Sequence, residues 1–200
     1  VADDPGMHSS QNEQDSRNHA RGAQLPMLEP ADSQEAVDFI KAAYEMSEKY
    51  DTPVLIRTTT RMAHARSLVT ESPRADIERK PYKKDPMKYV MMPGMAKVRH
   101  LYVEKRMKEL EKDACDMALN RIERGDDSIG VICSGAAYQY VKEAAPEVSV
   151  LKLGVVNPLP RALIEEFARS VGKLYVIEEL EPVFEEQIKS WGIECVGKEL

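Results

Sequence analysis

The sequence Ile129-Gly130-Val131-Ile132-Cys133-Ser134-Gly135 predicts a buried strand followed by a tight turn. Residues 129–133 are apolar apart from glycine, which is typical of a strand covered on both faces. A helix is expected over residues 136–145, because Pro146 then stops it. The same order repeats downstream, with strands at 148–153 and 173–177 and helices at 161–171 and 182–191. Strands that alternate with short helices predict an α/β fold with a parallel sheet.

A second α/β element lies upstream. Asp32 and Glu35 have the spacing of a capping box, so a helix is expected from this point to about Tyr50. A short β-branched strand follows at 53–58. This order predicts half of an open α/β domain. The helix residues expected to face the core are Val37, Ile40, Ala43, Tyr44 and Ser47.

Residues 62–97 show no periodicity, and four prolines interrupt them, so a linker is expected there. A long helix should follow from Val98 to about Arg124. The sequence therefore predicts two α/β units, residues 1–61 and residues 127–200, which residues 62–126 connect as a linker and a long helix. The helix residues expected on one face are Leu101, Tyr102, Leu110, Ala114, Met117, Ala118 and Ile122.

Composition narrows the functional classes. The 200 residues carry a formal net charge of −6, which argues against a nucleic-acid partner. No apolar run approaches the roughly 18 residues that a membrane span needs, so no membrane partner is expected. Three widely separated cysteines indicate reduced thiols in a cytoplasm and provide no cluster site. The chain opens on Val1 without methionine, and we interpret it as a fragment of a longer polypeptide.

Residues 3–17, Asp-Asp-Pro-Gly-Met-His-Ser-Ser-Gln-Asn-Glu-Gln-Asp-Ser-Arg, predict a loop dense in hydrogen-bonding side chains. Such a loop is either a solvated tail or a ligand contact held on a rigid scaffold. Arg17 and Arg21 follow at a spacing of four, and each offers a fork of donors that matches a carboxylate. Surface solvation is the alternative for both arginines.

For three other motifs, a structural role is the simpler interpretation. Ser134-Gly135 could hold an anion at a helix N-terminus, but such a turn also needs small residues for backbone reasons alone. Cys133, at the end of an apolar strand, is expected to be a buried and inert thiol. Glu178 and Glu179 end a strand where α/β sheets bind ligands, but adjacent strand residues point in opposite directions, so no coupled dyad is expected.

The loop also carries a family resemblance, together with Leu25-Pro26-Met27-Leu28-Glu29-Pro30, residues 53–61, residues 131–138 and residues 176–182. These stretches resemble the alpha subunits of indolepyruvate:ferredoxin oxidoreductases, a thiamine-diphosphate-dependent 2-oxoacid:ferredoxin oxidoreductase family. The resemblance covers nearly the whole chain. It implies that residues 1–61 are the end of a pyrimidine-binding domain and residues 127–200 a transketolase-C-terminal-like domain with its end missing.

The resemblance also implies an activity. The full enzymes oxidatively decarboxylate arylpyruvates such as indolepyruvate to aryl-acetyl-CoA in amino-acid catabolism, and ferredoxin accepts the electrons. They use thiamine diphosphate with Mg²⁺ and 4Fe-4S clusters, and their partners are a beta subunit, ferredoxin, coenzyme A and the 2-oxoacid. The cofactor-activating glutamate and the Mg²⁺ and cluster ligands of the family have no counterpart here. No catalytic or metal residue is therefore assigned, and the chain alone should be inactive.

By the same resemblance, the loop should form part of the substrate and cofactor wall, with Arg17 as the expected contact of the oxoacid carboxylate. Two alternatives stay open. The enzyme could act on another 2-oxoacid, or the chain could be a non-catalytic α/β binding or assembly module. The candidate wall residues are His8, Ser9, Ser10, Gln11, Asn12, Gln14, Arg17 and Arg21.

Overall fold

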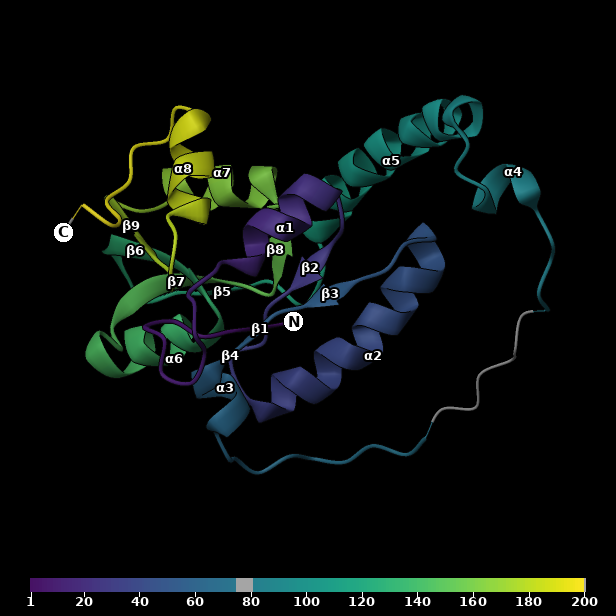
Figure 1. The fold of residues 1–200 in the computed structure, drawn as a ribbon. Coiled ribbons are helices and arrows are strands. Elements are labelled where there is room, and N and C mark those ends of the chain that lie inside the picture. Colours follow the sequence, from purple (N-terminus) through teal and green to yellow (C-terminus); the bar gives the residue numbers. More distant parts are fainter. Residues whose placement is uncertain (75–80, 200) are drawn as a thin grey trace.

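The computed structural model describes residues 1–74 and 81–199 (Figure 1). Its larger sheet has the strand order β5-β7-β6-β9. The central strand β6 runs parallel to both β7 and β9, while β5 is antiparallel to β7. The prediction of an α/β fold with parallel strands is confirmed. The strands are β5 (Arg121–Glu123), β6 (Asp126–Ser134), β7 (Val148–Leu153) and β9 (Lys173–Ile177).

Helices cover both faces of this sheet. Alternate residues of β6 point to opposite faces, so Ile132 joins one apolar core while Val131 and Cys133 join another. The helices α1, α7 and α8 pack on the Ile132 face, and α6 packs on the other. Their bounds are α1 (Ser16–Ala23), α6 (Gly135–Ala144), α7 (Arg161–Arg169) and α8 (Val183–Ser190).

The N-terminal part forms two small sheets. In one, β1 (Ala2–Asp3) pairs in parallel with β4 (Thr58–Thr59). In the other, β2 (Met27–Leu28) lies between β3 (Leu55–Ile56) and β8 (Val155–Asn157). Because β8 follows β7 along the chain, the regions 1–61 and 127–200 share this second sheet.

The helix α2 (Ser33–Tyr50) begins as predicted. The Asp32 carboxylate accepts from the Glu35 backbone N–H at 2.8 Å, and the Glu35 carboxylate accepts from the Ala31 N–H at 2.7 Å. The predicted core stripe is wrong at Ile40 and Tyr44, which are 48% and 70% exposed. Val37 and Ser47 are half-buried, and Ala43 is buried as predicted. The larger side chains of a neighbouring stripe set the orientation of the helix. Its buried residues are Glu35, Phe39, Ala43, Met46 and Tyr50.

The long helix is shorter and earlier than predicted. It is α5 (Pro93–Ala114), and only Leu110 and Ala114 are buried in it, while Leu101 is 69% exposed. The Asn120 side chain donates to the Ala114 carbonyl at 2.7 Å and accepts from the backbone N–H groups of Gly154 and Val155 at the start of β8, so the chain turns there. The predicted helix end therefore becomes the strand β5.

The segment before α5 contains two short helices, α3 (Thr60–His64) and α4 (Pro86–Tyr89). Figure 1 shows α4 and the N-terminal half of α5 projecting from the rest of the molecule. Part of the predicted linker, residues 75–80, lies outside the described residues. In the two described ranges, no helix is long and apolar enough to cross a bilayer.

Limited proteolysis should cut this segment first. Residues 65–74 and 81–85 have no helix or strand and are exposed, so their backbone can enter a protease site at little cost. Mass spectrometry of early trypsin fragments should place the first cleavages at Arg66, Arg74, Lys83 or Lys84. First cleavages within the four-stranded sheet would contradict this expectation.

Candidate functional site

The polar loop is residues 4–15, between β1 and α1, and two carboxylates fix its backbone. The Asp4 carboxylate accepts from the Thr60 hydroxyl and from the backbone N–H groups of Ser9 and Ser10, at 2.5 and 2.6 Å. These hydrogen bonds, that from Thr60 foremost, hold the pKa of Asp4 well below its usual range. Glu13 accepts from the Gly6 N–H at 2.6 Å. The loop is therefore held in one shape by its own acids.

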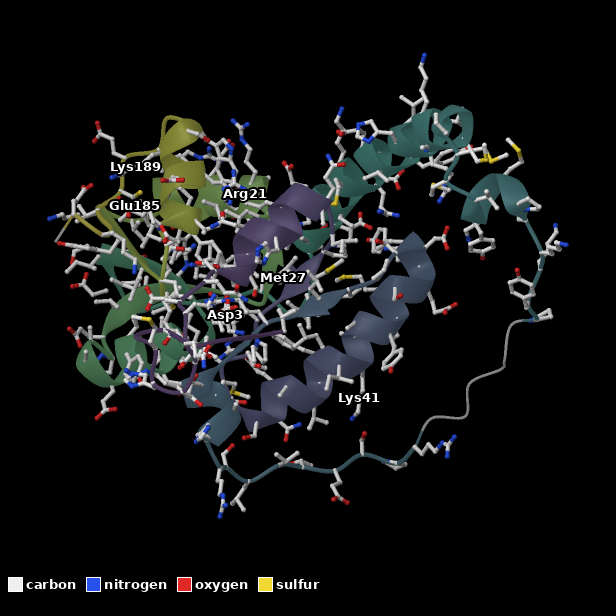
Figure 2. All side chains as sticks on the ribbon, in the orientation of Figure 1. Asp3, Arg21, Met27, Lys41, Glu185 and Lys189 are labelled. Carbon is white, nitrogen blue, oxygen red and sulfur yellow. The ribbon has the colours of Figure 1, made fainter. Side chains whose placement is uncertain are left out.

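Six of the predicted wall residues form one exposed surface on this loop, which we call the polar crown. Its side chains make no hydrogen bond to any other part of the described chain, so their donors and acceptors stay available. Arg21 is also exposed but lies on the last turns of α1, and Figure 2 shows it away from Asp3 at the base of the loop. The polar crown consists of His8, Ser9, Ser10, Gln11, Asn12 and Gln14.

Arg17 does not belong to the polar crown, which corrects the sequence interpretation. Its side chain is 1% exposed, and it forms ion pairs with Asp15 at 2.6 Å and Glu178 at 2.5 Å. Its guanidinium also donates to the backbone carbonyls of Glu179 and Glu181. Nε, Nη1 and Nη2 each donate to protein acceptors, so the structure supports a scaffold role for the Arg17 guanidinium.

A second buried arginine, Arg57, lies beside this cluster. Its Nε donates to Asp3 at 2.6 Å, and its Nη1 donates to Glu29. Glu29 in turn accepts from the Ser134 hydroxyl at 2.8 Å. A Cβ at Gly135 would meet Glu29 Oε1 at 2.4 Å, so only glycine fits. The Ser134-Gly135 turn therefore contacts an anion, and that anion is the protein's own Glu29.

Three buried polar atoms near Arg57 lack hydrogen-bond partners within the described residues: Arg57 Nη2, Thr59 Oγ1 and Glu179 Oε2. The Thr59 hydroxyl faces Glu179 without reaching hydrogen-bond geometry. Burial and the nearby charge of Glu29 raise the pKa of Glu179, and the arginines only partly oppose this. Burial raises the pKa of the neighbouring Glu178 as well, against the charge of Arg17.

Sequence reasoning missed Arg61 as a site residue. It follows Thr60, the anchor of Asp4, and its side chain is 52% exposed. Its Nη1 donates to the Tyr140 hydroxyl at 2.7 Å, and its Nε lies 3.7 Å from Glu179. The sequence did offer one indication of this role, because Arg61 is the last residue of the stretch 53–61 that resembles the oxidoreductase family. Arg61 supplies a partly exposed positive charge next to the loop anchor.

A separate ion cluster fastens α2 to the sheet. Glu35 accepts from Lys152 and from Arg121, both at 2.5 Å. Burial opposes ionisation of Glu35, but the Lys152 charge and the hydrogen bonds outweigh it and lower the pKa of Glu35. Lys152 is fully buried on β7. It therefore ties the N-terminal helix to the central sheet.

Cys133 is buried as predicted, and burial raises the pKa of its thiol to about 12. The thiol is therefore protonated and inert at neutral pH. In the part of the chain that the structure describes, no three His, Cys, Asp or Glu side chains gather in a way that could hold a metal ion.

The α/β fold and the anchored loop agree with a match to a family of cofactor-binding oxidoreductases. The family model described as pyruvate flavodoxin/ferredoxin oxidoreductase, thiamine diP-binding, matches residues 3–126. Since the match covers more than half of the chain, the chain belongs to this family. The match includes the polar loop, Arg57, Arg61 and α5.

Named relatives narrow this assignment. Indolepyruvate oxidoreductase subunit IorA of Methanothermobacter thermautotrophicus is 44% identical over 94% of this chain, which covers 32% of that protein. The IorA subunit of Pyrococcus horikoshii is 42% identical over 100% of this chain and 34% of its own length. The IorA subunit of Archaeoglobus fulgidus is 37% identical over 99% of this chain, which covers 33% of that protein. The resemblance to indolepyruvate oxidoreductase subunits is confirmed, and the chain spans about a third of these relatives.

A solved structure supports the fold alone. The 2-oxoglutarate:ferredoxin oxidoreductase from Magnetococcus marinus, with 2-oxoglutarate, coenzyme A and succinyl-CoA bound, aligns with a TM-score of 0.59 at 14% identity. The alignment covers 86% of this chain and 38% of that chain.

Replacing Arg17 should destabilise the fold. In Arg17→Met, the carboxylates of Asp15 and Glu178 stay buried without their cation, and breaking such a pair costs about 3–5 kcal/mol. Urea unfolding followed by circular dichroism should show this loss of unfolding free energy. The matched control is Arg21→Met on the exposed side of α1, which should change it by less than about 0.5 kcal/mol. Equal stability of the two variants would refute the structural role.

Glu179→Gln should stabilise the chain at neutral pH. A pKa raised in the folded state means that folding favours the protonated carboxyl. The protonated group therefore contributes to the free energy of unfolding, and this contribution is complete below the unfolded pKa of about 4.3. It is lost as pH rises through the folded pKa. Glutamine stays neutral, so the variant should unfold at a higher temperature than wild type at pH 7 and at a similar temperature near pH 4.

The exposed Glu186→Gln on α8 is the control for Glu179→Gln and should leave the pH dependence of the melting temperature unchanged. A Glu179→Gln curve parallel to wild type across the whole range would show that folding does not raise the pKa of Glu179.

Proposed function

We propose that this chain forms part of the oxoacid-binding wall of an indolepyruvate:ferredoxin oxidoreductase. The complete enzyme oxidatively decarboxylates arylpyruvates to aryl-acetyl-CoA and passes the electrons to ferredoxin. The observation that carries the proposal is the polar crown, an exposed set of free donors and acceptors on a backbone fixed by Asp4 and Glu13. The names of the relatives support indolepyruvate rather than another 2-oxoacid.

The crown's chemistry suits an organic ligand. It contains hydroxyls, amides and one imidazole, and its neighbouring carboxylates Asp4 and Glu13 are already engaged by backbone N–H groups. These groups fit the polar atoms of an oxoacid and the edge of a bound thiamine diphosphate, which supplies the electron sink for decarboxylation. They do not suit a hard cation, which prefers carboxylates. We therefore place the Mg²⁺ and 4Fe-4S ligands in the rest of the enzyme.

A carboxylate substrate also needs a positive charge near the crown. Arg17 is saturated by the protein, so this role passes to Arg61 or Arg21. We favour Arg61, because Thr60 connects α3 directly to Asp4 of the loop and because half of the Arg61 side chain is exposed. The Tyr140 hydroxyl and Glu179 hold its guanidinium in place, which reduces the entropy lost when an anion binds.

The further partners are a beta subunit, coenzyme A and ferredoxin. The projecting half of α5 and the residues just before it support additional protein contacts, because Met91 and Met92 before the helix and Val98 and Leu101 on it are exposed. We also infer a cytoplasmic location, which the three free thiols support. A purely structural module is the competing function, and substrate kinetics distinguish it.

In the complete enzyme, Arg61→Gln should raise the KM for indolepyruvate about tenfold to a hundredfold, since hydrogen bonds to charged groups are worth roughly 1.5–3 kcal/mol. Arg61→Lys should recover only part of the loss, because it restores the charge and not the planar fork. Binding of thiamine diphosphate, measured by calorimetry, should be unchanged. The measurement is steady-state reduction of ferredoxin.

Arg21→Gln is the matched comparison in the same assay and should leave KM nearly unchanged. A larger effect from Arg21 would move the carboxylate contact to α1. Normal kinetics in Arg61→Gln, Arg21→Gln and a Ser9→Ala/Asn12→Ala crown variant would support the purely structural module.

A further inference from the structure

A cavity of about 200 Å³ lies between the C-terminal end of α2 and α5, away from the polar crown. Its walls carry the cations Lys49, Arg99, Lys105 and Arg106 and the rings of Tyr50 and Tyr102. Asp51 and Glu109 are the acids on its lining. The cavity is therefore lined mainly by basic and aromatic side chains.

The acids at this cavity do not balance its cations. Asp51 faces Lys88 at 2.6 Å and Arg99 at 3.7 Å, while Lys105 pairs with Glu109 and Lys49 with Asp113. Arg106 donates to the Asp51 backbone carbonyl and has no carboxylate partner among the described residues. The C-terminus of α2 contributes about half a negative charge. Five cations against three acids and this dipole leave a surplus of about 1.5 positive charges.

Arg106 also has an unused donor. Its Nε is buried and has no acceptor within the described ranges. Burial lowers the pKa of Arg106, and the neighbouring charge of Arg99 adds to this lowering while Asp51 opposes it. Both guanidinium-bearing residues line the same cavity, and the Arg99 guanidinium stacks over Tyr102, 4.9 Å from the ring centroid. A buried donor without an acceptor is costly, and a bound anion would supply the acceptor.

We propose that this cavity binds a phosphate group. A phosphate monoester carries about −1.5 to −2 charges at pH 7, which matches the surplus, and its oxygens suit the donor forks of Arg99 and Arg106. The volume accepts a phosphate ion or the phosphate end of a phosphate ester. The site is independent of the proposed oxoacid function. Its ligand is either free phosphate or a phosphate ester.

Isothermal titration calorimetry of the 200-residue chain, in a buffer without phosphate, tests the site. Inorganic phosphate should give a saturable heat that sodium chloride at equal ionic strength does not give. Coenzyme A and dephospho-coenzyme A, which lacks the 3′-phosphate, then distinguish the source. Tighter binding of coenzyme A than of inorganic phosphate or the dephospho form indicates an ester, and the reverse indicates free phosphate.

Arg106→Gln should weaken phosphate binding at least about tenfold, because a charge-assisted hydrogen bond is lost. Arg99→Gln should do the same, and it serves as the second variant if circular dichroism shows that Arg106→Gln is unfolded. The matched control is Lys108→Gln, which removes one exposed charge from the same helix outside the cavity and should bind normally. No heat above chloride in wild type, or equal losses in Lys108→Gln, would overturn the proposal.

Discussion

The buried ion pair between Arg17 and Glu178 is the contact on which the arrangement of the site depends, because it joins residues 161 positions apart. Glu178 lies just after β9 and also accepts from the backbone N–H groups of Phe184 and Glu185 at the start of α8. Arg17 lies in the first turn of α1, close after the polar loop. One guanidinium therefore fixes the end of the loop against the carboxyl edge of the sheet, where α/β folds place their ligands.

The cluster around this pair carries more negative than positive charge. Arg17 and Arg57 are its two cations, and five carboxyl groups surround them: Asp3, Asp15, Glu29, Glu178 and Glu179. Isolated buried charges are expensive, so each carboxylate must find donors or lose its charge. Asp3, Asp15, Glu29 and Glu178 have hydrogen-bond donors from the protein, and Glu179 Oε2 has none among the described residues. This excess of buried carboxyl groups agrees with the raised pKa values of Glu178 and Glu179, in both of which burial outweighs the charge of the nearby arginines.

Local sequence signals predicted the elements that local physics determines. The cap at Asp32 and the strand at 173–177 match the structure because hydrogen bonds and side-chain alternation within a few residues define them. The strand β5 was missed because the Asn120 side chain, which ends α5, bonds to Gly154 and Val155 far along the chain. The orientation of α2 was missed because two apolar stripes overlap in its sequence, and only packing against Leu110 and Val155 selects one.

The candidate site shows the same contrast between features that neighbouring residues determine and features that distant residues determine. The crown residues are exposed, as a loop with few apolar side chains favours, and their part in a substrate wall stays a prediction. The sequence could not distinguish Arg17 from Arg21, because both offer the same fork, and burial depends on acids from distant segments. In this fold, the buried arginines hold the scaffold and the neutral polar side chains face outward. Under the proposed function, the positive charge for an oxoacid comes from an arginine that the scaffold leaves partly exposed, and Arg61 meets that condition beside the loop anchor.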